Sequence, residues 1–269
     1  MAKGAHGGRR GAGKAGGGSS TTVQPINNMN DAIGAMRGMG MKVSDFTEWV
    51  LSDGKMFDEQ LMVENTRQLM SLESKYGVIH DSASVELDYT ELGKSTAFVQ
   101  PASYDAMDNQ KLVLDTTYFG NRTKMISDME YSQQTGDLLE SEKSMVGVYA
   151  VTHEYGHMMQ HKIIANSLAK DYDSNMKLYN DGRIDEWTLN DNIYSSYLNH
   201  VTSLNNQIID VAVKQNPSMS RSAIEKTMST YGTSTPAEFF AEAFANANCG
   251  KPNVIGKAMQ EWLRQGGYK

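Results

Sequence analysis

Apolar side chains recur every three to four residues along most of the chain, a period that predicts helices. The clearest stripe predicts a helix over about 55–75, which ends where Gly77 provides a stop. A helix is also predicted over 44–53, where Ser44 is a candidate N-cap. Further apolar stripes and capping signals predict helices at about 123–133, 142–165, 186–215, 222–225, 236–248 and 253–264.

Between residues 78 and 119 the pattern changes to short β-branched or aromatic runs, separated by Gly, Pro, Asp and Asn. Three of these runs predict the strands of a small mixed sheet: ASVELDY, TAFVQPA and KLVLDTTYF. The sheet and the helices together predict an α+β fold that is mostly helical.

Residues 1–28 are rich in glycine and nearly free of large apolar side chains. Such a segment cannot bury a core, so we expect a disordered leader before a folded domain at 29–269. The first 20 residues contain four basic residues and no acid; 21 basic and 32 acidic residues remain, a balance of −11. An acidic domain argues against nucleic acid as the main substrate, although the basic leader could contact nucleic acid weakly.

Cysteine usage and hydropathy set the expected compartment. The single cysteine, Cys249, excludes an internal disulfide and fits a reducing compartment. No apolar stretch approaches the ~20 residues that span a bilayer. No apolar segment follows the basic N-terminus, as a secretory signal would require. The protein is therefore expected to be cytoplasmic and to have no membrane partner.

The segment VTHEYGHMMQH, residues 151–161, carries the candidate chemistry. On a helix, His153 and His157 leave the same face one turn apart, where both rings can reach one Zn²⁺ at about 2.0–2.1 Å. Glu154 can reach a metal-bound water without binding the metal, which is the general-base position of HExxH. Chance produces this pattern on the order of once in a hundred such chains. Two solvated histidines beside an acid therefore remain the alternative until a third ligand is found.

The third ligand is not expected from His161, because eight residues of continuous helix place it about 12 Å along the axis from His153. A better source is the downstream segment STPAEFFAEAF, in which Pro236 suits the first turn of a helix. Glu238 and Glu242 lie four residues apart on the polar face of this helix. One can complete a His₂Glu site, and the other can accept a hydrogen bond from the far nitrogen of a ligand histidine.

HEYGH followed by YGTSTPAEFFAEAF resembles the catalytic domain of anthrax lethal factor and its bacterial and phage-borne relatives, which are gluzincin-type zinc metallopeptidases. The resemblance implies a zincin-like fold, in which a glutamate-bearing helix packs beside the HExxH helix. By position, it implies one Zn²⁺ per chain, held by His153, His157 and Glu238, with Glu154 as the catalytic base. Tyr231, seven residues before Glu238, matches the tyrosine that assists the reacting oxygen.

The resemblance covers about residues 78–165 and 229–248, and the segment between them is longer than in lethal factor. A helical insertion is therefore expected at about 166–228. The implied function is a zinc-dependent endopeptidase that acts on a protein or peptide. Zincins generally bind an extended peptide against an edge strand, and NQKLVLDTTYF at 109–119 is the candidate because it is the last strand-like run before HEYGH.

An alternative belongs to a different class of protein. The chain could be a phage virion protein, or another structural or interaction protein, whose zincin-like domain has a secondary catalytic role or none. The Gly-rich basic leader would then contact other virion components, and the virion would be its location. Normal assembly of an inactive Glu154→Gln variant into particles would favour this alternative.

Overall fold

The computed structural model describes residues 25–43, 57–91, 93 and 95–266. Most of the predicted leader and the predicted helix at 44–53 lie outside these residues. Ile26 is buried and the Asn28 side chain caps the first helix, so these two residues, which were predicted to belong to the leader, take part in the fold. The described chain has an α+β architecture that is mostly helical, as predicted.

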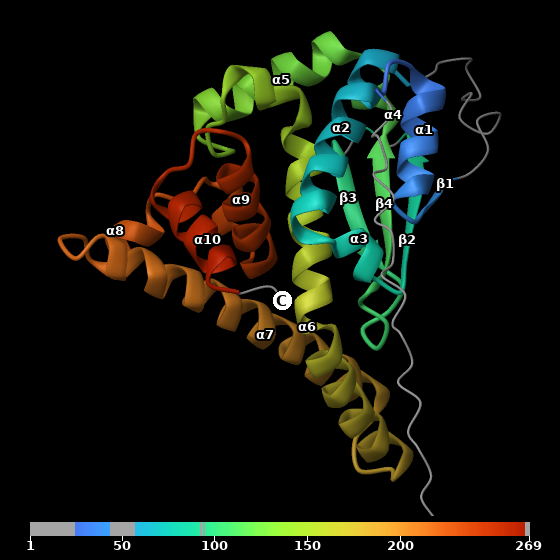
Figure 1. The fold of residues 1–269 in the computed structure, drawn as a ribbon. Helices are drawn as coiled ribbons and strands as arrows, with labels where there is room; N and C mark the ends of the chain where they lie inside the picture. Colours follow the sequence, from blue (N-terminus) through green and yellow to red (C-terminus); the bar gives the residue numbers. More distant parts are fainter. Residues whose placement is uncertain (1–24, 44–56, 92, 94, 267–269) are drawn as a thin grey trace, which may run out of the picture.

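One long helix, α6 (Tyr149–Asn180), runs through the centre of the molecule. The sheet lies on one side of α6 and α9 (Pro236–Asn248) lies on the other, while α7 (Glu186–Gln215) packs against both helices (Figure 1). Two helices that are far apart in the sequence, α6 and α9, are therefore in direct contact. The other helices among the described residues are α1 (Met29–Gly38), α2 (Glu59–Tyr76), α3 (Val78–Asp81), α4 (Thr116–Phe119), α5 (Arg122–Thr135), α8 (Arg221–Glu225) and α10 (Val254–Arg264), with 3₁₀ turns η2 (Lys143–Val148) and η3 (Tyr231–Thr233).

The sheet is small and mixed, as predicted. Within the described residues it has the order β1-β2-β4-β3, in which β1, β2 and β4 are parallel and β3 is antiparallel to β4. The strands are β1 (Met41–Val43), β2 (Ser84–Thr90), β3 (Ala97–Pro101) and β4 (Asn109–Asp115). The sequence pattern predicted only the last three. The first strand has three residues, too few for a pattern of alternating polarity to be recognised.

The predicted edge strand is wrong. β4, which lies within NQKLVLDTTYF, pairs with β2 on one side and β3 on the other, so β3 is the edge strand next to α6. The run also stops being a strand at Asp115, whose side chain accepts a hydrogen bond from the backbone N–H of Thr117 and caps α4. Pro101 at the end of β3 is a residue that sheets tolerate at an edge, because it has no N–H to donate.

The helix that carries HExxH differs from its predicted limits of 142–165. Lys143–Val148 is a 3₁₀ turn, and α6 continues to Asn180. Its last turns pair with the start of α7 as a two-helix arm, in which Asp171 contacts Ser196 and His200 through hydrogen bonds. Leu168 is the last buried residue of α6, so the apolar stripe used for prediction fades before the helix ends.

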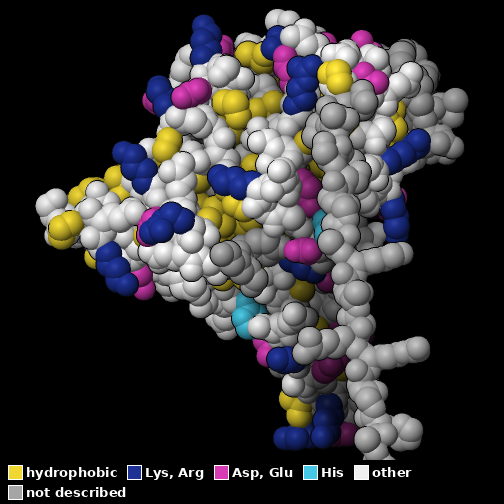
Figure 2. Space-filling model, viewed as in Figure 1, with side chains coloured by type: hydrophobic (Ala, Val, Ile, Leu, Met, Phe, Trp, Pro, Cys, Tyr) yellow, Lys and Arg dark blue, Asp and Glu magenta, His cyan; other side chains and the backbone are white. Residues whose placement is uncertain are grey.

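The arm lies within the expected helical insertion at about 166–228, and α7 has the predicted limits. Acidic and basic side chains lie side by side along the arm (Figure 2), as expected of a solvated helical pair. Although α6 has 32 residues and α7 has 30, no helix in the described part of the chain is apolar enough to cross a membrane.

The short helix predicted from the capping box at 222–225 begins earlier than expected. Ser220, rather than Ser222, caps α8, because its hydroxyl accepts a hydrogen bond of 3.1 Å from the backbone N–H of Ala223. Serine is a preferred N-cap residue, so residue type alone does not distinguish Ser220 from Ser222.

Gly156 allows α6 and α9 to approach closely. A Cβ atom at this position would lie 3.0 Å from the Cα of Ala241 and 3.1 Å from the Cβ of Phe244, both on α9. Because the first of these atoms is backbone, a side chain at 156 can be accommodated only if α9 moves. The contact between the two candidate ligand helices thus depends on this glycine.

We expect Gly156→Ala to destabilise the fold by about 1–3 kcal/mol, the usual cost of overpacking a tight contact. In a chain of this size this lowers the melting temperature by about 2–4 °C per kcal/mol. Gly34→Ala is the matched control, because a Cβ there meets nothing within 4 Å and alanine is the better helix former in α1. A melting temperature for Gly156→Ala at or above that of Gly34→Ala would contradict the close-approach argument.

Candidate metal centre

The candidate ligands come from the contact between α6 and α9. His153 and His157 lie one turn apart on α6 and face α9. α9 starts with Pro236, and the Thr235 side chain caps it by accepting a hydrogen bond of 3.2 Å from the backbone N–H of Glu238. This cap fixes Glu238 in the first turn, from which its carboxylate reaches both histidines.

The three ligand atoms form a compact triangle. The Nε2 atoms of His153 and His157 are 3.2 Å apart, and the Oε2 atom of Glu238 lies 2.9 Å from the first and 3.3 Å from the second. Tetrahedral Zn²⁺ with ligands at about 2.0–2.1 Å separates them from one another by about 3.3 Å. His153, His157 and Glu238 could therefore hold one metal ion.

The donor chemistry also fits a cation. The Nδ1 atom of His153 lies 3.1 Å from the Oε1 atom of Glu242, so Nδ1 donates and Nε2 presents a lone pair. That lone pair faces a carboxylate oxygen of Glu238, another acceptor, and two acceptors at 2.9 Å need a positive charge between them. A proton or a metal ion can provide that charge.

The pKa shifts of His153 and Glu238 also indicate that positive charge is favoured between them. Burial lowers the pKa of His153, but hydrogen bonds to Glu238 and Glu242 outweigh burial and raise it to about 10. Burial raises the pKa of Glu238, but hydrogen bonds to His153 and His157 outweigh burial, and the pKa falls well below its usual range. The carboxylates that favour a proton on His153 also favour a divalent cation at the same place.

Glu242 orients His153. Its carboxylate is fully buried, and among the described residues four groups donate to it. They are His153 Nδ1 at 3.1 Å, Tyr149 hydroxyl at 3.1 Å, Leu139 N–H at 3.0 Å and Ser229 hydroxyl at 2.8 Å. The hydrogen bond expected between the second glutamate and a ligand histidine is thus present. The other donors come from separate segments and were not predicted, because no sequence spacing connects them.

His161 does not join the three candidate ligands, as predicted, and it is buried. Its Nδ1 atom lies 3.0 Å from the Oε1 atom of Gln110 on β4. Burial and the nearby His157 lower the pKa of His161 to about 3, so the ring is neutral at physiological pH.

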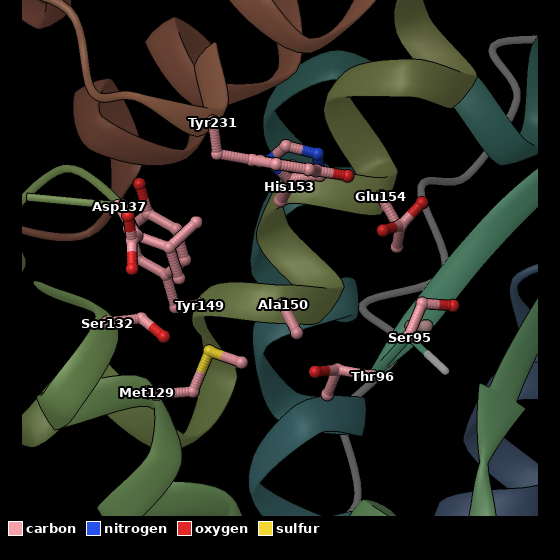
Figure 3. Close-up of a pocket in the computed structure, with 12 residues that line it drawn as sticks. Ser95, Thr96, Met129, Ser132, Asp137, Tyr149, Ala150, His153, Glu154 and Tyr231 are labelled. Atoms are coloured by element: carbon pink, nitrogen blue, oxygen red, sulfur yellow. The ribbon is translucent and has the colours of Figure 1, made fainter. Parts of the chain in front are cut away.

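Glu154 and Tyr231, the predicted catalytic residues, lie beside His153, one of the three residues of the triangle (Figure 3). Glu154 is buried and its Oε2 atom has no hydrogen-bond partner among the described residues, an arrangement that proteins rarely keep without a use. Burial raises its pKa. The Tyr231 ring centroid is 5.7 Å from that of His153, and burial together with Glu238 raises the pKa of Tyr231, which keeps its hydroxyl protonated.

Two neighbouring cavities, both lined in part by the edge strand β3, together form a cleft beside the triangle. One has about 300 Å³ and is lined by His153, Met129 and Ala150 among others (Figure 3). The other has about 410 Å³ and is lined by His157 and Glu238 among others. Both cavities are lined by Ala97, Glu154 and Tyr231, so a molecule that occupies both must pass over the candidate catalytic groups.

Comparison with protein-family models, curated proteins and solved structures finds no match to this chain.

Proposed function

We propose that this protein is a zinc-dependent endopeptidase of the gluzincin type, in which His153, His157 and Glu238 hold one Zn²⁺. The observation that carries the proposal is the triangle of ligand atoms, 2.9–3.3 Å apart, with the free carboxylate oxygen of Glu154 beside it. The contact between the HExxH helix and the glutamate-bearing helix also supports the zincin-like fold that the sequence resemblance implies.

The residues around the triangle have complementary roles in amide hydrolysis. Zn²⁺ bound there would lower the pKa of a water ligand to about 7 and polarise the scissile carbonyl. Glu154 accepts the proton of the attacking water and returns it to the leaving amine, a role that suits a carboxylate whose pKa is raised by burial. Tyr231 remains protonated, so its hydroxyl can donate a hydrogen bond to the oxygen that gains negative charge.

The edge strand supports an extended peptide as the substrate. The backbone C=O of Thr96 accepts a hydrogen bond from the N–H of Asp115, and the N–H of Ala102 donates to the C=O of Asn109. Because these bonds alternate along an antiparallel pair, the even-numbered residues of β3 direct their backbone groups towards β4. The odd positions, Ala97 and Val99, therefore turn their N–H and C=O groups away from the sheet and towards the cleft. A peptide added there as a further strand would be recognised through its main chain.

The proposal is tested with purified, zinc-loaded protein and a pool of peptides of mixed sequence, analysed by mass spectrometry. We expect about one zinc per chain and products that arise from cleavage at internal peptide bonds, because one cavity lies beside His153 and another beside His157, which gives room for a peptide before and after the scissile bond. A chain that holds zinc but leaves every peptide intact would contradict the proposal and favour a structural or binding role.

A further inference from the structure

The cavity beyond His157 has a wall of aromatic side chains. We call it the aromatic cavity; its lining includes Phe98, Tyr104, Met107, His161 and Tyr197. The Tyr104 and Tyr197 rings are 5.9 Å apart and inclined by 55°, and the His161 and Tyr197 rings are 6.4 Å apart and inclined by 53°. These are the separations at which aromatic rings attract one another. A further ring that enters the cavity can make the same type of contact.

One polar atom of this wall lacks a partner. Gln110 donates from Nε2 to the carbonyl of Met158 at 3.2 Å, so its Oε1 is the atom that accepts from His161. His161 therefore carries its hydrogen on Nδ1 and presents Nε2 as an acceptor. Within the described residues no group donates a hydrogen bond to Nε2 of His161. This atom is not fully enclosed by the protein. A ligand with an N–H or O–H group can satisfy it.

The direction of β3 assigns the aromatic cavity to one side of the scissile bond. β3 starts at Ala97, which lines both cavities, as does Ser95 just before it. β3 ends at Pro101, which lines the aromatic cavity but not the cavity beside Ala150. A peptide antiparallel to β3 runs the opposite way. Its residues on the amino-terminal side of the scissile bond then occupy the aromatic cavity, and those on the carboxyl-terminal side occupy the cavity beside Ala150.

We propose that the aromatic cavity binds a tyrosine or tryptophan side chain on the amino-terminal side of the scissile bond. This inference rests on the proposed peptidase function. The ring would pack against Tyr104 and Tyr197, and the hydroxyl or indole N–H would donate to Nε2 of His161. Phenylalanine fits the wall but leaves His161 without a partner. Tyr197 belongs to α7, so the helical insertion takes part in substrate selection.

The test uses one peptide sequence in which a single position before the cleaved bond is tyrosine, tryptophan, phenylalanine, leucine or alanine. We expect kcat/KM for tyrosine to exceed that for alanine by at least about 10-fold, through burial of the ring. We expect it to exceed that for phenylalanine by about 2- to 10-fold, the usual gain from one hydrogen bond. Equal cleavage of all five peptides would overturn the inference and leave the peptidase proposal intact.

Variants locate the preference in the cavity wall. His161→Phe should remove the discrimination between tyrosine and phenylalanine, and Tyr197→Leu should reduce the preference for aromatic residues over leucine. Tyr131→Leu is the matched control, because Tyr131 is 66% exposed on α5 and lines neither cavity. Zinc content and melting temperature verify that each variant is folded. An unchanged order of preference in folded His161→Phe and Tyr197→Leu proteins would overturn the assignment.

A binding measurement separates this inference from the proposed function. The same peptides are titrated into the zinc-loaded Glu154→Gln variant by calorimetry. If no peptide is cleaved by the wild type but the tyrosine peptide binds most tightly, the cavity assignment holds and the peptidase proposal fails. If the peptides bind without preference, or none binds, the cavity assignment is wrong.

Discussion

Glu154→Gln is expected to bind zinc as the wild type does and to lose peptidase activity by a factor of about 10²–10⁴, the usual contribution of a general acid–base group. Glutamine has nearly the same shape as glutamate, but its amide cannot take a proton from water at neutral pH. Glu154 is not part of the triangle formed by His153, His157 and Glu238, so zinc content should not change. The measurements are kcat/KM on a cleaved peptide and zinc per chain by elemental analysis.

The same substitution should not weaken the fold. The Oε2 atom of Glu154 is buried without a partner among the described residues, and a buried polar atom without a hydrogen bond costs free energy in the native state. The melting temperature of Glu154→Gln should therefore equal or exceed that of the wild type. Glu186→Gln, on the exposed start of α7, is the matched control and should keep full activity. If Glu154→Gln retained more than about a tenth of the activity, another group would have to be the base.

The candidate site could be predicted because its parts are local in sequence. The four-residue spacing of His153 and His157 and the start of α9 at Pro236 are properties of single helices. α9 has its predicted limits, and α6 contains the whole HExxH segment although its own limits differ from the prediction. Which glutamate faces the histidines depends on how α9 packs on α6, and spacing alone did not decide it. The resemblance favoured Glu238, and in the structure its carboxylate approaches both rings while Glu242 contacts only the far side of His153.

The edge strand was predicted wrongly because order along the chain does not give order in a sheet. β4 follows β3 in sequence but inserts between β3 and β2 in space. Two local signals pointed to the correct edge. Pro101 lies inside the run TAFVQPA, where a sheet tolerates proline at an edge, and β4 contains three consecutive apolar residues at 112–114, as is typical of a strand with both faces covered. The donors to Glu242 left no such signal, since Tyr149, Leu139 and Ser229 meet only in the folded chain.

Glu238→Ala is expected to abolish stoichiometric zinc binding and, with it, all measurable cleavage. Two histidines alone leave the ion without the third protein ligand that catalytic zinc sites have. The substitution also removes the negative charge that offsets the positive charge of the ion beside His153 and His157. The measurement is zinc per chain by elemental analysis after dialysis against a weak chelator, with peptide cleavage measured on the same samples.

Glu242 provides the matched comparison, because it lies four residues along the same helix and contacts the same histidine on its other nitrogen. Glu242→Gln keeps one acceptor oxygen, so it should retain zinc with an affinity reduced by about 10–100-fold, as is usual when the partner of a ligand histidine is changed. Glu242→Ala should in addition lower the melting temperature, since the hydroxyls of Tyr149 and Ser229 and the N–H of Leu139 lose a buried acceptor. Glu238 is partly exposed, so Glu238→Ala should show the opposite pattern, with zinc lost and the metal-free fold nearly as stable as before. If Glu238→Ala kept one zinc per chain while Glu242→Gln lost it, the roles of the two glutamates would have to be exchanged.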